Sequence, residues 1–235
     1  MAAPTVLFLP GLLEDADAFR QQIDSIGARA RCVVADLTRS ESIAALAKDA
    51  LAQAGTSESL SVAGHSMGGY VALELVRQAP RQVQRLALLN TNARADSPES
   101  TDNRKRLMAL SEKDFPAVIS TLMPKLVLEE HRDDGRDITG TITEMALAAG
   151  RDSFLRQERA IIRRIDSRPH LAAIRCPALV VAARNDAIMP VEWLEELAGG
   201  IPGARLEVVE TCGHMSTLER PAEISKLLVD WLESG

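Results

Sequence analysis

Aromatic residues and cysteines are scarce in this chain of 235 residues. Phe, Trp and Tyr together make up 3% of the sequence, so aliphatic side chains must fill the core and few rings are available to stack on a ligand. The three cysteines, Cys32, Cys176 and Cys212, are odd in number and show neither a CxxC motif nor Cys/His metal-ligand spacing. The composition therefore argues against a disulfide framework, and no metal site is expected.

The chain also lacks a long apolar run and a block of charge of one sign. No stretch approaches the roughly 20 apolar residues of a membrane helix, and the N-terminal run ends at Pro10 with no Lys or Arg before Arg20, unlike a signal peptide. Lys and Arg number 27 against 33 Asp and Glu, which gives a net charge of -6 with the two signs interspersed. We therefore expect a cytoplasmic protein that binds neither membranes nor nucleic acids.

Short aliphatic runs alternate with amphipathic stretches along most of the chain. The runs 5–9, 31–35, 60–63, 85–90, 178–183 and 205–209 are continuous rather than alternating, which is typical of strands buried on both faces. Between them, 17–26, 42–54, 67–78, 191–198 and 222–233 have helical periodicity. This order predicts an α/β fold with a mostly or wholly parallel sheet and helices on both faces.

The alternation breaks once, between residues 90 and 177, where a long and mostly helical segment contains no convincing strand. Pro98, Pro116 and Pro124 punctuate it, and Gly150 separates two further helical runs. We expect several short helices folded over the loop end of the sheet. The predicted organisation is a core of residues 1–90 and 168–235 with a helical cap or lid insertion of residues 91–167.

The strongest local motif is GHSMGG at residues 64–69, directly after a predicted strand and directly before a predicted helix. It matches G-x-S-x-G in the context that this motif requires, a sharp turn that presents Ser66 at the edge of the sheet. The positive end of the following helix also faces the hydroxyl, which suits a developing oxyanion. Ser66 is therefore the candidate nucleophile.

A serine hydroxyl needs a base at neutral pH, and the chain has 4 histidines. His65 adjoins the serine but is expected to point away from it, and His131 and His170 are expected to be solvated. His214 follows the last predicted strand and precedes the last predicted helix, so its loop reaches the same sheet edge as Ser66. His214 is the candidate base.

The base needs an acid that fixes its tautomer. Asp186 follows the strand predicted at 178–183, again at the loop end, and the order Ser, Asp, His is that of one group of hydrolases. Asp96, after the strand predicted at 85–90, is the second candidate. Alternatively, Asp186 caps the helix that opens near Pro190.

Three segments together resemble the α/β-hydrolase superfamily over essentially the whole chain: GHSMGG, the Asp186 segment ending in Pro190, and Gly213-His214 followed by LERP at 218–221. The resemblance implies an oxyanion hole made by the backbone N–H groups of Leu12 and Met67. In this family a histidine usually stands where this chain has Pro10. Because the hole uses backbone groups, this departure affects the pocket entrance rather than hydrolysis.

The resemblance further implies a sheet of about six strands and hydrolysis of a small to medium carboxylic ester through an acyl-enzyme, with a small-molecule ester as substrate and without a metal or organic cofactor. A lactonase, a thioesterase, a C–C bond hydrolase or a related lyase would use the same residues. Outside enzymes, a ligand receptor that keeps the triad and a non-catalytic interaction module remain alternatives. The oligomeric state, monomer or homodimer, is not readable from the sequence.

Two groups of residues in the insertion have open roles. One is a run of arginines near acidic residues, expected to form a solvated, salt-paired helix or, alternatively, to face the pocket and select an anionic substrate: Arg151, Arg156, Arg159, Arg163 and Arg164 with Asp152, Glu158 and Asp166. The other is a set of apolar residues expected mainly to pack the helices: Leu107, Leu110, Phe115, Ile119, Leu122, Met123, Leu126, Met145, Leu147 and Phe154.

Overall fold

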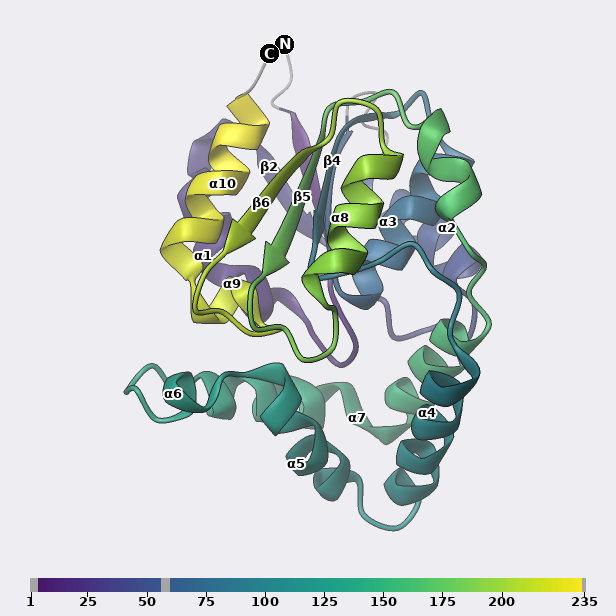
Figure 1. Cartoon of the computed structure of the whole chain (residues 1–235), viewed down its shortest axis with the longest axis vertical. Coiled ribbons are helices and arrows are strands. Elements are labelled where there is room, and N and C mark those ends of the chain that lie inside the picture. Colours follow the sequence, from purple (N-terminus) through teal and green to yellow (C-terminus); the bar gives the residue numbers. More distant parts are fainter. Residues whose placement is uncertain (1–3, 56–59, 234–235) are drawn as a thin grey trace.

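The computed structural model describes residues 4–55 and 60–233, so the ends of the predicted core and residues 56–59 lie outside it. Its centre is one 6-stranded sheet with the order β2-β1-β3-β4-β5-β6, in which every neighbouring pair is parallel (Figure 1). The strands are β1 (Thr5–Leu9), β2 (Arg31–Val34), β3 (Leu60–His65), β4 (Val83–Leu89), β5 (Ala178–Ala183) and β6 (Arg205–Val209). The predicted fold class is confirmed.

Helices cover both faces of the sheet (Figure 1). On one face α2 (Ile43–Ala54), α3 (Met67–Gln78) and α8 (Val191–Gly200) pack in one apolar cluster, and on the other face α1 (Arg20–Ile26) and α10 (Pro221–Glu233) pack in a second. Short helical turns complete the core: η1 (Ala16–Phe19), η2 (Gly27–Arg29), η3 (Arg168–Ala173) and α9 (Ser216–Glu219). Because β1, β3 and β5 are buried along their whole length, their apolar residues do not alternate with exposed polar ones.

Between β4 and β5 the chain forms the helices α4 (Pro98–Ser111), α5 (Phe115–Leu126), α6 (Glu129–Arg132) and α7 (Ile138–Ile162). Figure 1 places them beyond the ends to which the strand arrows point. Ser97 and Asp114 cap α4 and α5 by accepting the amide hydrogens of Ser100 and Ala117, and a proline follows each cap.

Two details of this insertion differ from expectation. Pro124 does not punctuate a helix, because it lies in the last turn of α5 and the helix continues to Leu126. The helix α7 is long rather than short, with 25 residues, but Gly150 at φ 79° and ψ 165° divides it into two segments. A left-handed φ of this kind suits glycine, which explains the break predicted there.

Within the described residues, no helix is long and apolar enough to cross a membrane.

Candidate active site

Ser66 lies in a strained turn between β3 and α3. Its φ of 51° and ψ of -116° lie outside the ordinary regions for a residue with a side chain, which costs about 1–3 kcal/mol. The turn is held because the Ser66 amide donates to the Leu89 carbonyl at 3.0 Å. A Cβ atom on Gly64 would lie 2.4 Å from the Gly68 carbonyl oxygen, and one on Gly68 would lie 1.8 Å from that of Leu9. The glycines of the motif are therefore required for close backbone approach.

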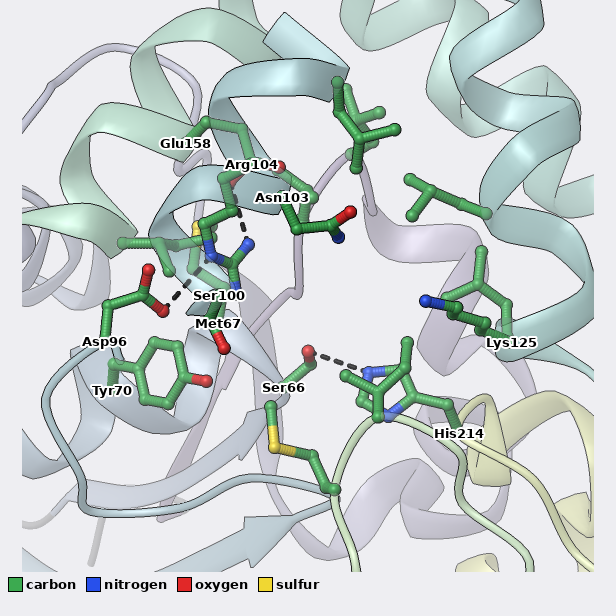
Figure 2. Close-up of a pocket in the computed structure, with 18 of the residues that line it drawn as sticks. Ser66, Met67, Tyr70, Asp96, Ser100, Asn103, Arg104, Lys125, Glu158 and His214 are labelled. Carbon is green, nitrogen blue, oxygen red and sulfur yellow. Dashed lines mark hydrogen bonds and ion pairs between the residues drawn. The ribbon is translucent and has the colours of Figure 1, made fainter. Parts of the chain in front are cut away.

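The structure brings the three predicted residues into one hydrogen-bonded chain. His214 Nε2 lies 2.9 Å from Ser66 Oγ (Figure 2), and His214 Nδ1 lies 2.8 Å from Asp186 Oδ2. Both His214 and Asp186 are buried. A serine, an imidazole and a carboxylate in this geometry can transfer the serine proton to the ring while the carboxylate holds the other ring nitrogen protonated.

Asp186 is tied down by more than the imidazole. Its Oδ1 accepts the amide hydrogens of Ile188 at 2.8 Å and Met189 at 2.9 Å. Burial alone would raise the pKa of Asp186, but the charge and hydrogen bond of His214, helped by the Met189 amide and Asn90, hold that pKa below its ordinary value. The capping alternative is wrong, because α8 starts after Pro190 without a side-chain cap.

Asn90, which the sequence analysis did not single out, completes the surroundings of the carboxylate. Its amide nitrogen donates to Asp186 Oδ2 at 2.9 Å, and its amide oxygen accepts the Ser216 hydroxyl at 2.6 Å. It follows β4 directly, with φ 47°, and is fully buried. The sequence did contain a signal for this residue, because Asn90 is an amide side chain at the end of a predicted strand, on the sheet edge that carries Ser66.

The two predicted oxyanion donors lie beside the nucleophile. Leu12 and Met67 both line the cavity that contains Ser66. Among the described residues, no acceptor for the N–H of either residue is found. Met67 is also the first residue of α3, so its amide lies at the positive end of a 12-residue helix.

The cavity above Ser66 has a volume of about 340 Å³ and is lined by residues of both the core and the insertion. Its apolar wall is formed mainly by Leu12, Leu107, Ile119, Leu122, Leu126, Ile142, Met145, Ala146, Ile161, Ile188, Met189 and Trp193. Of the apolar insertion residues expected to pack helices, Leu107, Ile119, Leu122, Leu126 and Met145 thus also contact the cavity, whereas Phe154 is buried in a helix-packing cluster and Leu147 is 50% exposed.

One wall of the cavity carries a buried ionic cluster. Arg104 lies 2.8 Å from Glu158 and 3.2 Å from Asp96 (Figure 2), and Arg164 lies 2.7 Å from Asp96. Burial raises the pKa of Glu158, although the charge of Arg104 opposes that effect. Because Asp96 pairs with Arg104 and Arg164 rather than with His214, its position does not support its role as the second candidate acid.

Most arginines of the run 151–164 bind partners away from the cavity, as expected for a solvated, salt-paired helix. Arg159 lies 2.6 Å from Glu41, Arg156 donates to the Thr38 carbonyl, and Arg151 pairs with Asp152. Of the acidic residues expected as partners, Asp152 pairs within the run, whereas Glu158 pairs with Arg104 and Asp166 with Arg168. Among the residues of the run, only Arg164 lines the cavity around Ser66 in the part of the chain that the structure describes.

The remaining histidines have distinct surroundings. His170 is exposed, as expected, and His65 points away from Ser66, with its Nε2 2.9 Å from the His214 carbonyl oxygen. The expectation of a solvated His131 is wrong: it is 7% exposed, and its Nδ1 lies 2.8 Å from Glu219 Oε2. The partner lies 88 residues away in the sequence, so no local pattern indicates it.

The three cysteines are free, and burial raises the pKa of each thiol. A raised pKa disfavours the thiolate, so none of them competes with Ser66 as a nucleophile. In the described part of the chain, no group of three or more His, Cys, Asp or Glu residues is placed to hold a metal ion.

Comparisons with known proteins identify the family of the chain. Residues 4–221 match the family model described as the alpha/beta hydrolase fold. A protein of Azorhizobium caulinodans named "Putative carbamate hydrolase RutD" is 30% identical over 97% of this chain and 91% of its own length. A 2-hydroxy-6-oxononadienedioate/2-hydroxy-6-oxononatrienedioate hydrolase of Pseudomonas putida is 28% identical over 75% of this chain and 63% of its own length.

Solved structures show the same fold. A thermophilic esterase from Thermogutta terrifontis, with malate bound, superimposes with a TM-score of 0.89 at 27% identity, covering 98% of this chain and 90% of its own. An enol-lactonase from Burkholderia xenovorans gives a TM-score of 0.90 at 23% identity, covering 100% and 93%. With nearly the whole sequence matched by the family model and a 6-stranded parallel sheet in place, the chain belongs to the α/β-hydrolase fold family.

Proposed function

We propose that this hydrolase cleaves a small to medium carboxylic ester with Ser66 as nucleophile, His214 as general base and acid, and Asp186 as the orienting carboxylate. The observation that carries the proposal is the hydrogen-bonded chain from Ser66 Oγ through His214 to Asp186, with distances of 2.9 and 2.8 Å, at the floor of the cavity. A nucleophile, a base and an orienting group within hydrogen-bond reach are the requirements of acyl transfer.

In the first half-reaction, His214 Nε2 takes the Ser66 proton as Oγ attacks the ester carbonyl carbon. The charge that develops on the carbonyl oxygen is bound by the N–H groups of Leu12 and Met67, which have no other acceptor among the described residues. Protonated His214 then gives its proton to the leaving alcohol, and an acyl-enzyme on Ser66 remains.

In the second half-reaction, His214 deprotonates a water that attacks the acyl-enzyme, and the carboxylic acid leaves as Ser66 regains its proton. Asp186 stays ionised throughout, in keeping with its lowered pKa. Each new charge therefore forms next to a group of opposite charge or to an N–H donor.

The helical insertion acts in this proposal as a cap that selects the substrate. Leu107, Ile119, Leu122 and Met145 all come from its helices and contact the cavity. A volume of about 340 Å³ lies near the lower end of the range for small-molecule sites. This favours acyl groups of a few carbons over long chains.

A carbamate is the second candidate substrate class. The A. caulinodans relative, whose name specifies a carbamate hydrolase, covers almost the whole of this chain. Carbamates and esters share the carbonyl that Ser66 would attack, so the same three residues serve both. The C–C hydrolase and the enol-lactonase among the similar proteins would differ from an esterase in the bond that is cleaved at the carbonyl carbon. That bond is a C–C bond in the first and a lactone C–O bond in the second.

The test is a panel of p-nitrophenyl esters of increasing acyl length, with an aryl carbamate, a lactone, a thioester and a vinylogous 1,5-diketone. Wild type is compared with Ser66→Ala and with Ser100→Ala, a matched control because Ser100 also lines the cavity but its side chain, among the described residues, hydrogen-bonds to Ser97 and not to the triad. We expect turnover of short esters that Ser66→Ala abolishes and Ser100→Ala keeps. Equal background rates for all three proteins on every compound would refute the proposal.

A further inference from the structure

The charges that line the cavity do not cancel. In the ionic cluster, Asp96 and Glu158 offset Arg104 and Arg164. Arg94, which also lines the cavity, pairs with Glu196 at 2.7 Å, and the carboxylate of Glu14, another lining residue, lies 2.9 Å from His65 Nδ1. Each of these guanidinium groups therefore already has a carboxylate partner.

Lys125 is different. It lies in the last turn of α5 and lines the cavity, and within the described residues no carboxylate is within ion-pair distance of its ammonium group. Figure 2 shows Lys125 reaching into the cavity on the side of His214, away from Asp96 and Arg104. The positive charge thus faces the space that a substrate on Ser66 would fill.

We propose that Lys125 binds a carboxylate on the acyl part of the substrate, so that the enzyme prefers esters with an anionic end over neutral esters of the same length. The inference rests on the proposed function. One uncompensated positive charge matches the single charge of a carboxylate better than the charge of nearly two of a phosphate. The apolar wall formed by Leu122, Leu126 and Met145 would hold the methylene groups between the two ends.

The matched substrates are mono-p-nitrophenyl glutarate and p-nitrophenyl pentanoate, which differ in a terminal carboxylate against a methyl group. The ratio of their kcat/KM values is measured for wild type, Lys125→Met, Lys125→Arg and Lys105→Met. Lys105 is a matched control because it is exposed on α4, does not line the cavity and pairs with Asp102.

We expect the glutarate-to-pentanoate ratio to fall on the order of 10-fold in Lys125→Met, because the variant loses the ion pair with the substrate carboxylate. The fall is limited to this size because Lys125 is exposed and water weakens the ion pair. Lys125→Arg and Lys105→Met should keep the ratio. An unchanged ratio in Lys125→Met, with both esters turned over by wild type, overturns the proposal.

Binding separates this inference from the proposed function. Calorimetry measures the affinity of the half-ester for Ser66→Ala and for the Ser66→Ala/Lys125→Met double variant. If wild type hydrolyses neither ester, the proposed function fails, yet weaker binding by the double variant still supports the anion site. Equal affinity of the two proteins overturns the anion site whatever the hydrolysis results are.

A second inference comes from the two nitrogens of His65, whose ring is fully buried. Its Nδ1 lies 2.9 Å from both Glu14 carboxylate oxygens, and its Nε2 lies 2.9 Å from the His214 carbonyl oxygen. With Glu14 ionised both partners are acceptors, so both ring nitrogens donate and the ring is an imidazolium, in keeping with the raised pKa of His65. Glu14 also accepts the Gly11 amide hydrogen at 2.8 Å.

The pair therefore joins the three segments that would act together: the loop with Leu12, the turn with Ser66 and the loop with His214. We infer that His65 is a positioning residue, whose protonated ring fixes the backbone of His214 and so the ring that faces Ser66. Burial lowers the pKa of His65, but Glu14, the His214 carbonyl and the charge of Asp186 outweigh it and raise the pKa above the ordinary value. The rings of His65 and His214 lie 5.2 Å apart.

Two variants test the Nε2 contact of this ring separately from its Nδ1 contact. In His65→Gln the amide reaches the position of Nε2 and can still donate to the His214 carbonyl, whereas in His65→Asn it reaches only the position of Nδ1. We expect His65→Asn to lower kcat about 10-fold with KM within twofold, and His65→Gln to recover most of that loss. Equal kcat for both variants and wild type overturns the positioning role.

A measurement on wild type does not depend on variant folding. Nitrogen-15 shifts of labelled histidine should show both His65 nitrogens protonated at pH 7 and one proton lost at higher pH. Because the folded pKa is raised, the stability that His65 contributes is complete below about pH 6.5 and is lost as the pH rises through the folded pKa. A neutral His65 at pH 6 contradicts the inference.

Discussion

Two buried histidine–carboxylate pairs with the same 2.8 Å separation lie in different regions of this molecule. His214 and Asp186 lie at the edge of the sheet, whereas His131 of α6 and Glu219 of α9 join the insertion to the core. The second ring nitrogen of His214, Nε2, lies 2.9 Å from Ser66 Oγ, whereas Nε2 of His131 lies 3.8 Å from the carboxylate of exposed Glu130. A buried histidine–carboxylate pair alone would therefore not support a proposal of catalysis. The strained serine and the nearby amides distinguish the first region.

The largest expected effect comes from breaking the first pair or its serine. Ser66→Ala should lower kcat/KM about 10⁴- to 10⁶-fold, and Asp186→Asn about 10⁴-fold because His214 loses its preferred tautomer. Steady-state kinetics on the best ester of the panel measures both losses, and circular dichroism confirms folding. Asp186→Asn activity within tenfold of wild type would contradict the assignment of Asp186.

The second pair should affect stability instead. In His131→Gln, the buried carboxylate of Glu219 loses its ring partner and, within the described residues, keeps the Leu128 amide at 3.1 Å. We expect a loss of about 2–3 kcal/mol in the free energy of unfolding, with kcat/KM changed less than tenfold. Urea denaturation of His131→Gln, Glu219→Gln and the double variant gives the coupling. Loss of activity comparable to Asp186→Asn, at unchanged stability, would remove the distinction between the two regions.

The smallest effect concerns acid stability. Because the pKa of Asp186 is lowered in the folded state, its ionisation stabilises the fold above the unfolded value of about 3.9, and that contribution is lost as the pH falls through the folded pKa. The difference in unfolding free energy between wild type and Asp186→Asn should therefore shrink below about pH 4. A difference that grows on acidification would mean that burial outweighs the hydrogen bonds of the carboxylate.

The same contrast explains what the sequence could predict. Strands β1, β5 and β6 and helix α3 have the predicted bounds, because burial on two faces or a regular apolar stripe leaves a local pattern. The sequence could indicate that the candidates Ser66, Asp186 and His214 lie together because each follows a strand, and parallel strands end at one edge.

Pairs made across the fold left no such pattern. The partners Glu14 and His65 are 51 residues apart, Arg104 and Glu158 are 54 apart, and His131 and Glu219 are 88 apart. Each residue alone has the ordinary features of a surface position in the sequence. Only the folded chain shows that they are buried and paired, which is why the polar lining of the cavity could not be predicted.

The glycine that divides α7 separates two segments that both line the cavity but are held differently. The segment before Gly150 supplies Ile142 and Met145 to the cavity wall. The segment after it supplies Glu158 and Ile161 and is also hydrogen-bonded to the core through Gln157, which accepts the Leu13 amide hydrogen and donates to the Leu37 carbonyl. A library randomised at cavity-facing positions of 138–149 would therefore explore new acyl groups while the anchoring segment stays intact. For enzyme engineering, Gly150 marks the boundary between the part of α7 to vary and the part to keep.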